Sequence, residues 1–195
     1  HQRTAQTLIG PPRAAWLQGR AVFAGLMLVG LVAIALPPYS TSLAVEPNPN
    51  LTFGGWAALL PLSLIAVLIQ SSADEILFRG YMQQQLAARF RTPLIWAVVP
   101  SILFALGHYV PEETGEYAVL ITLWAAVFGL LMADLTARAG TLGPAIAVHF
   151  ANNISALLLM SVTGSMDGLA LFVSPAAAVD PELVRAWLPA DFAAM

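Results

Sequence analysis

Residues 53–89 read FGGWAALLPLSLIAVLIQSSADEILFRGYMQQQLAAR, and this stretch decides the class of fold. It carries no charge before Asp74, and about 20 mostly apolar residues in a helix span the roughly 30 Å hydrocarbon core of a bilayer. Asp74, Glu75 and Arg79 then follow without a break in the helical pattern. A charge inside a span costs roughly 2.5–3.5 kcal/mol on insertion scales, so it usually faces a partner or a wet cavity. The stretch therefore predicts a membrane helix that carries a polar site.

The whole chain has the composition of an integral membrane protein. Of its 195 residues, 58% are hydrophobic and 10% are charged, with a mean hydropathy of +0.76. Soluble domains carry about 25% charged residues, so a water-soluble fold could not cover itself with so few. Cysteine is absent, which excludes disulfides, thiolate metal ligands and a cysteine nucleophile. The net charge of −3 and the lack of a basic run speak against a nucleic-acid partner.

The sequence predicts an all-α fold, a polytopic transmembrane helix bundle of about five spans plus a short C-terminal interfacial segment. The spans are expected at residues 15–36, 53–89, 93–109, 116–138 and 142–163. The first is interpreted as a membrane helix and not as a cleaved signal peptide. The interfacial segment is 168–173, and the tail from Pro175 is expected to be polar and loosely held. Because the sequence begins at His1, we expect further residues before it.

The charged residues in the loops predict an orientation. Arginines and acids alternate from loop to loop, and cytoplasmic loops of membrane proteins carry the excess of basic residues. The N-terminus is therefore expected in the cytoplasm and the tail outside. The arginines are Arg3, Arg13, Arg20, Arg89, Arg91 and Arg138, and the acids of the opposite loops are Glu46, Glu112, Glu113 and Glu116.

The first polar cluster is Asp74, Glu75 and Arg79. Glu75 and Arg79 lie at i,i+4, so their side chains can pair along one helix face. The simplest interpretation is an ion pair that neutralises itself near the membrane interface. Asp74 adds a second carboxylate, and the remaining negative charge requires another cation, a proton or a metal.

The second cluster is Phe104 and His108, which share a helix face at i,i+4. A lone histidine inside a span is more often a packed, hydrogen-bonded residue than a catalyst. However, Asp74 and His108 are each 17 residues from Arg91. If the chain forms an antiparallel hairpin that turns near Arg91, Asp74 and His108 lie at a similar depth.

The third cluster is His149 and Asn153, again at i,i+4 on one face. Histidine and asparagine also occur in membrane helices as hydrogen-bonding residues that hold helices together. That structural interpretation is adopted for Asn152, and Asp134 is likewise taken as structural.

Three clusters on three helices can form one reactive site. A carboxylate and a histidine can activate a water as general base, while the second histidine or the asparagine stabilises the tetrahedral oxyanion. Glu75, His108 and His149 are also candidates for holding a divalent metal such as Zn²⁺ with an open position for water. The sequence does not decide between these two ways of activating water.

The three clusters resemble the motifs of the CPBP family, whose members are membrane peptidases related to type II CAAX prenyl endopeptidases and bacteriocin-processing or immunity (Abi) proteins. The family pattern is E-E-x-x-x-R, F-x-x-x-H and H-x-x-x-N on successive helices. The resemblance covers roughly residues 53–163. The matching residues are Asp74-Glu75 with Arg79, Phe104 with His108, and His149 with Asn153.

This resemblance implies roles for the matched residues. It makes the first acid, Asp74, the general base, working with the histidine of the second motif. It makes the second acid and the arginine charge partners of the base. Asp74 stands where the family usually has glutamate, one methylene longer, and misplacing a catalytic group by about 1 Å can cost on the order of 10²-fold in rate. His149 and Asn153 would bind the oxyanion or complete a metal-ligand set.

The resemblance also implies a domain organisation and a location. Residues 1–52 would be an N-terminal region with the first span, 53–165 the CPBP-like catalytic core and 166–195 a partly interfacial tail. The expected location is a bacterial inner membrane.

Three functions are considered. The leading hypothesis is an intramembrane endopeptidase that cleaves a membrane-associated peptide or protein near the cytoplasmic face. The second is a non-catalytic relative that acts as a subunit, chaperone or immunity partner of another membrane protein, supported only by Asp74. The third is a proton or ion carrier, although neither the repeat symmetry nor the broken helices of transporters are evident in the sequence.

Overall fold

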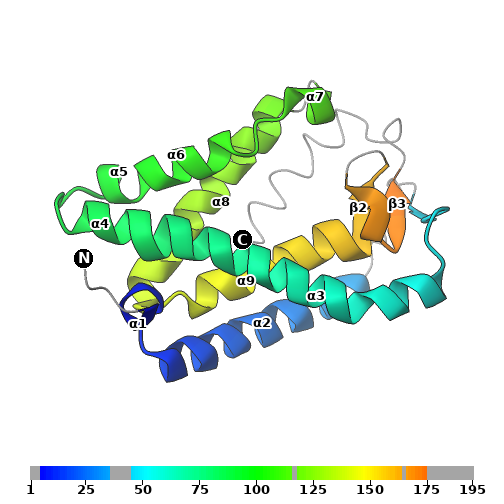
Figure 1. The fold of residues 1–195 in the computed structure, drawn as a ribbon, viewed down its shortest axis with the longest axis horizontal. Helices are drawn as coiled ribbons and strands as arrows, with labels where there is room; N and C mark the ends of the chain where they lie inside the picture. The colour runs from blue at the N-terminus through cyan, green and yellow to red at the C-terminus, as the bar shows by residue number, and fades with distance from the viewer. Residues whose placement is uncertain (1–4, 36–44, 116–117, 164–165, 175–195) are drawn as a thin grey trace. The chain divides into compact units, whose positions relative to one another are not determined.

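The computed structural model describes residues 5–35, 45–115, 118–163 and 166–174, and most of them are helical (Figure 1). They fall into two compact units, which are described one at a time. The first lies within His1–Val32 and Ile65–Asn153, and the second within Ala33–Leu64 and Ile154–Met195. The predicted loose tail from Pro175 lies outside the described residues, as do Arg3 and Glu116.

The first unit is built from helices. Proline at the first position starts α2, α5 and α7, where its missing N–H costs nothing. Gly140 follows the end of α8 with a φ of +68°, a left-handed conformation that glycine adopts without strain. Three of the helices that contribute to this unit, α2, α3 and α9, continue into the other. The helices are α1 (Ala5–Ile9), α2 (Pro12–Ala35), α3 (Phe53–Glu75), η1 (Ile76–Gln83), α4 (Gln84–Ala87), α5 (Pro93–Trp96), α6 (Val98–Leu106), α7 (Pro111–Thr114), α8 (Ala118–Ala139) and α9 (Gly143–Ile154).

The stretch quoted at the outset is continuous helix from Phe53 to Ala87, as expected. Its middle section, η1, is a π-helix, and it begins directly after Glu75. π-helical turns are rare and frequently lie at functional sites. The change of helix type therefore falls inside the first polar motif.

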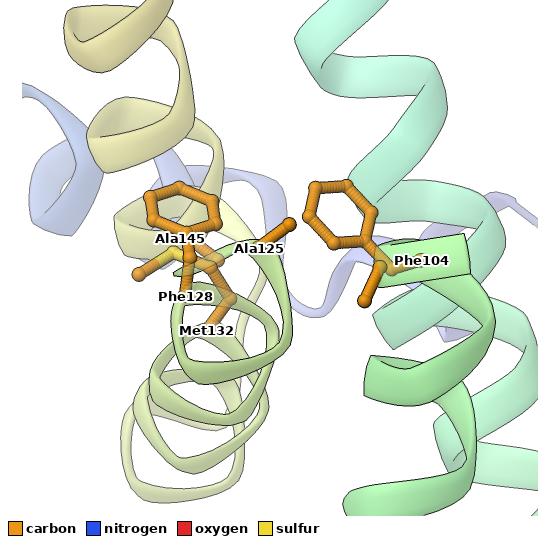
Figure 2. Close-up of a cluster of buried hydrophobic side chains, with 6 residues drawn as sticks. Phe104, Ala125, Phe128, Met132 and Ala145 are labelled. Carbon is orange, nitrogen blue, oxygen red and sulfur yellow. The ribbon is translucent and has the colours of Figure 1, made fainter. Parts of the chain in front are cut away.

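The core of the first unit lies between α6, α8 and α9 (Figure 2). The side chain of Phe104 in α6 faces a group of residues from the other two helices, and the ring of Phe104 stacks 6.2 Å from that of Phe128. The buried cluster consists of Phe104, Ala105, Ala125, Phe128, Met132 and Ala145.

Helices α6 and α8 pack side by side (Figure 1). A small residue on each helix permits the close approach. A Cβ on Gly129 would lie only 2.9 Å from the Cβ of Ser101, so a larger residue would push the helices apart. Small residues at helix contacts are typical of membrane bundles, where close packing drives association.

The second unit contains a small sheet that the sequence analysis did not predict. Its strand order is β1-β3-β2, with β1 antiparallel and β2 parallel to β3. Asn48 holds the loops around it, because its buried amide donates to the carbonyls of Asp167 and Ala170, both at 2.8 Å. The indole of Trp56 donates to the Leu158 carbonyl at 2.9 Å. The elements are β1 (Glu46–Pro47), the first part of α3, η3 (Ser155–Leu159), β2 (Met160–Val162), η4 (Asp167–Leu169) and β3 (Phe172–Ser174).

The all-α prediction is confirmed, with spans that differ in length from those expected. Among the described residues, three helices are long and apolar enough to cross a membrane: Pro12–Val32, Phe53–Ala87 and Ala118–Ala139. The other two expected spans are shorter apolar helices, Pro93–Leu106 and Gly143–Leu159. At 1.5 Å per residue they fall short of the roughly 30 Å core, so the count of five spans stays a prediction.

Candidate active site

The centre of the site is Glu75, the last residue of α3. Its side chain is fully buried in the first unit. The Oε1 atom accepts from Arg79 Nη1 at 3.1 Å and lies 2.9 Å from Nδ1 of His149. Oε2 has no hydrogen-bond partner. A buried carboxylate is expensive unless it is paired, so this contact set explains why one acid can lie inside the helix bundle.

Arg79 provides the compensating charge. It is 1% exposed, and besides Glu75 it donates from Nη2 to the carbonyl of Gly129 at 3.0 Å. The guanidinium carbon lies 4.9 Å from the centroid of the Phe104 ring, a cation–π contact. The predicted i,i+4 pairing of Glu75 and Arg79 is confirmed, and its position is fixed by α6 and α8.

His149 on α9 completes the buried triad. Because an ionised carboxylate only accepts, the Nδ1 atom that faces Glu75 carries the proton. The imidazole lies edge-on to Phe104 and Phe128, with centroids 5.7 and 5.4 Å away. These contacts fix the ring, and in the neutral form they leave Nε2 as a proton acceptor.

His108 is held in the same way from another element. The residue follows α6, two positions beyond its last residue, so the helix expected to reach Tyr109 ends earlier. Its Nδ1 lies 2.9 Å from the Phe104 carbonyl, which can only accept, and Nε2 is again left as the acceptor in the neutral form. The rings of Phe104 and His108 are 4.5 Å apart, which confirms their predicted shared face. Phe104 thus contacts both histidines.

Asp74 is half-buried and lies within electrostatic reach of Glu75, His108 and His149. This supports the expected similar depth of Asp74 and His108. Its Oδ2 accepts from Gln70 Nε2 at 2.5 Å, one helical turn earlier. The less buried carboxylate is therefore the one whose environment is open to a reactant, while Glu75 is enclosed.

Gln70 is a site residue that the sequence analysis missed. Its Oε1 accepts from Asn153 Nδ2 at 2.8 Å, so a chain of hydrogen bonds runs from Asn153 through Gln70 to Asp74. Asn153 also donates to Ser71 at 3.3 Å. The sequence does contain a signal for Gln70, because it is a polar residue in an apolar helix, four positions before Asp74. In this arrangement the Asn153 amide is directed to α3.

Within the described part of the chain, two residues interpreted as structural have no hydrogen bond to the acids or histidines of the three motifs. Asp134 forms an exposed ion pair with Arg138, with 2.6 Å between Oδ2 and Nε. Asn152 donates to Asn153 at 3.3 Å, within its own helix and not to a neighbouring one.

The candidate metal ligands do not form a ligand set in the structure. Among the described residues, no three His, Asp or Glu side chains are close enough to share a metal ion. Oε1 of Glu75 accepts from Arg79 and His149. The Nδ1 atom of His149 is engaged by Glu75, and that of His108 by the Phe104 carbonyl. The arrangement thus fits activation of water by side chains better than a three-ligand metal site.

The chain is similar to a family of membrane peptidases and to one bacterial protein. A family model described as "Type II CAAX prenyl endopeptidase Rce1-like" matches residues 56–155, just over half of the chain. The match includes all seven residues of the three motifs, and it confirms the family resemblance. The chain is also 29% identical over 110 residues to "Uncharacterized protein YyaK" of Bacillus subtilis (strain 168). That alignment covers 56% of this chain but only 37% of the relative. No solved structure matches the chain.

Proposed function

This chain belongs to the type II CAAX prenyl endopeptidase Rce1-like family, and from that premise we propose that it hydrolyses a peptide bond with water activated by Asp74 and His108. The observation that carries the proposal is that the two acids lie in different environments. Glu75 is enclosed and paired, whereas Asp74 is half-buried and lies within electrostatic reach of both histidines. Two carboxylates in different environments are typical of acid–base catalysis.

Water activation falls to Asp74 and His108 in this proposal. The Nδ1–H of His108 is tied to the Phe104 carbonyl, so Nε2 is the atom that can take a proton from water. The Asp74 carboxylate orients the water and stabilises the imidazolium that forms. The water oxygen then attacks the carbonyl carbon of the scissile bond.

His149 serves the tetrahedral intermediate and the leaving group. With Nδ1–H directed at Glu75, a protonated His149 donates from Nε2 to the oxyanion. The C–N bond breaks as the amine nitrogen receives a proton from an imidazolium, and the proton count balances the one taken from water. Glu75, itself paired with Arg79, lies beside the ring as its counter-charge.

Gln70 and Asn153 act as positioning residues. Gln70 donates to Asp74 Oδ2 and accepts from Asn153, which fixes the orientation of the shorter aspartate side chain. The hydrogen bond from Gln70 thus compensates for the side chain of Asp74, which is one methylene shorter than the usual glutamate. Positioning of a catalytic group within about 0.5 Å is what such supporting contacts provide.

The proposed substrate is a membrane-associated peptide or protein, and the proposed location is a bacterial inner membrane with the N-terminus in the cytoplasm. The supporting observation for the orientation is the arginine content of alternate loops. The chain itself is an integral membrane protein of apolar helices.

The test compares the N-termini of membrane peptides in cells that express this protein or its His108→Ala variant. The matched control is Tyr109→Ala, which alters the adjacent exposed residue. We expect new N-termini with the parent chain and with Tyr109→Ala, and their absence with His108→Ala. Identical N-termini from the parent chain and His108→Ala, with both proteins stable and equally abundant, would refute the proposal.

A non-catalytic role as subunit, chaperone or immunity partner is the second candidate. It is favoured by the one substitution in the motif, Asp74, whose Oδ2 is already engaged by Gln70. If this role is correct, the parent chain and His108→Ala give identical N-termini. Another membrane protein then co-purifies with this chain in a fixed ratio.

A further inference from the structure

A cavity of about 520 Å³ lies in the first unit, between the N-terminal half of α2 and α9. Ligand pockets commonly measure about 300–1,000 Å³, so this one has the size of a small-molecule site. Among the described residues that line it, Arg20 alone carries a charge, and the others are apolar, aromatic or glycine. The seven motif residues are not part of this lining.

Two sets of contacts fix the walls of the cavity. Helices α2 and α9 lie side by side (Figure 1), and a Cβ on Gly19 would lie 2.9 Å from the Gly143 carbonyl oxygen. Farther along both helices, the rings of Phe23 and Phe150 stack 5.5 Å apart. The cavity is therefore bordered by helices that are held in place, as in the largely pre-formed pockets that bind ligands.

The side of α2 that borders the cavity carries a positive charge that the chain does not neutralise. Arg13 and Arg20 are seven residues apart and share one helix face with Trp16. Both arginines are exposed, and the ion pairs formed by the described residues involve neither of them. Residues 1–45 contain no acid at all. This face is therefore complementary to an anion.

Arg20 borders the cavity where α2 becomes continuously apolar. No charged residue follows it up to Ala35, so the Phe23 end of the cavity lies toward hydrocarbon. On the other side Trp16 is 70% exposed, and tryptophan is enriched at the level of the lipid headgroups. Arginine side chains near the end of a span reach toward the headgroups, and helical side chains slope toward the N-terminus of their helix. The cavity thus extends from the headgroup level into the apolar layer.

We propose that this cavity binds one phospholipid with an anionic headgroup. Its phosphate pairs with Arg20 and Arg13, because guanidinium groups bind phosphate through charge-assisted hydrogen bonds. Its acyl chain lies along the apolar wall that includes Phe23, Leu68 and Ala147. A soluble phosphate would leave this wall empty, and a zwitterionic lipid would leave the charge of the arginines uncompensated. The inference does not depend on peptide hydrolysis, because it rests on residues outside the motifs.

A lipid titration tests the headgroup. The purified full chain in mild detergent is titrated with dioleoyl phosphatidylglycerol or dioleoyl phosphatidylcholine, which have the same acyl chains, and native mass spectrometry counts the bound lipids. We expect the parent to retain one phosphatidylglycerol in preference to phosphatidylcholine. Arg20→Gln and Arg13→Gln should each weaken binding of phosphatidylglycerol about fivefold, the usual contribution of one arginine beside anionic lipid, and leave phosphatidylcholine unaffected. The matched control is Arg91→Gln, an exposed arginine outside the cavity, which should bind as the parent does.

A second set of variants tests the position of the acyl chain. Ala147→Phe fills the cavity and should weaken binding of phosphatidylglycerol about tenfold or more, because each methylene that loses its apolar contact costs several-fold in affinity. Ala24→Phe adds the same bulk at an exposed position of α2 outside the cavity and should have no effect. Leu68→Trp, at a half-exposed position of the lining, decides the matter if Ala147→Phe does not fold. Folding is checked by elution and melting against the parent chain.

Three results would overturn the proposal. Equal affinities of the parent for the two lipids would refute an anionic headgroup, as would an unchanged preference in both arginine variants. Unchanged binding of phosphatidylglycerol in the folded filled variants would show that the lipid binds elsewhere. A second copy of the chain bound in place of the lipid would show that the cavity is a protein interface.

Discussion

The buried pair of Glu75 and Arg79 should show strong energetic coupling. Glu75→Gln keeps the side-chain shape but leaves a guanidinium that is 1% exposed without its counter-charge. Removing one partner of a buried pair typically costs about 3–5 kcal/mol of unfolding free energy. Arg79→Met leaves the carboxylate with its contact to His149 but without its cationic partner, and should also destabilise the protein. The double variant buries neither charge, so we expect it to be more stable than the sum of the single effects predicts, by about 0.5–3 kcal/mol.

The assay is unfolding in mixed micelles by titration with a denaturing detergent, followed by helical circular dichroism. A second cycle, Asp134→Asn with Arg138→Met, is the matched control at the same i,i+4 spacing. That pair is closer, at 2.6 Å against 3.1 Å, but its side chains are 58% and 78% exposed. Solvent screening should leave it without measurable coupling. Additivity within about 0.3–0.5 kcal/mol at Glu75 and Arg79 would refute the reasoning, as would equal coupling in both pairs.

Two further predictions concern packing and the small sheet. Gly129→Ala should destabilise the protein by about 1–3 kcal/mol in the same titration, because the added carbon meets Ser101 at 2.9 Å. Gly25→Ala, with open space around it, should have no such effect, and equal results would contradict the close contact. Asn48→Ala should cost about 1–3 kcal/mol through lost buried hydrogen bonds and speed amide exchange in β2 and β3. Asn50→Ala is its exposed control, and unchanged exchange in the first variant would count against the role of Asn48.

The parts of the site that follow from helix geometry could be predicted from the sequence. Glu75 with Arg79, and Phe104 with His108, contact each other as the i,i+4 spacing predicts. Such contacts depend on the local backbone alone, because residues four apart lie on one face. The long membrane helices could also be predicted, because hydropathy depends only on contiguous stretches of sequence.

The parts that depend on tertiary packing could not be predicted. His149 meets Glu75 across 74 residues of sequence, and no periodicity specifies that pairing. Gln70 is recognised as a site residue by its hydrogen bond with Asn153 of α9, which depends on the packing of α9 against α3. The strands are two or three residues long and pair with distant partners, so they leave no alternating pattern to recognise.

The helix ends were also beyond the sequence analysis. The expected span at 93–109 ends at Leu106, which puts His108 in the turn after α6. The apolar run continues past this point, and hydropathy alone does not register where the backbone turns. The π-helix after Glu75 is a further departure, because its apolar pattern does not distinguish it from an α-helix.

The central claim is that Asp74 and His108 activate water, and purified protein in bilayers tests it most directly. Cleavage of a peptide that carries the cell-derived site is measured for the parent, Asp74→Asn and the exposed-acid control Asp134→Asn. We predict that Asp74→Asn lowers kcat/KM by about 10²-fold or more, the usual contribution of acid–base catalysis, while the control keeps the parent rate. Cleavage by Asp74→Asn at the parent rate would contradict the account.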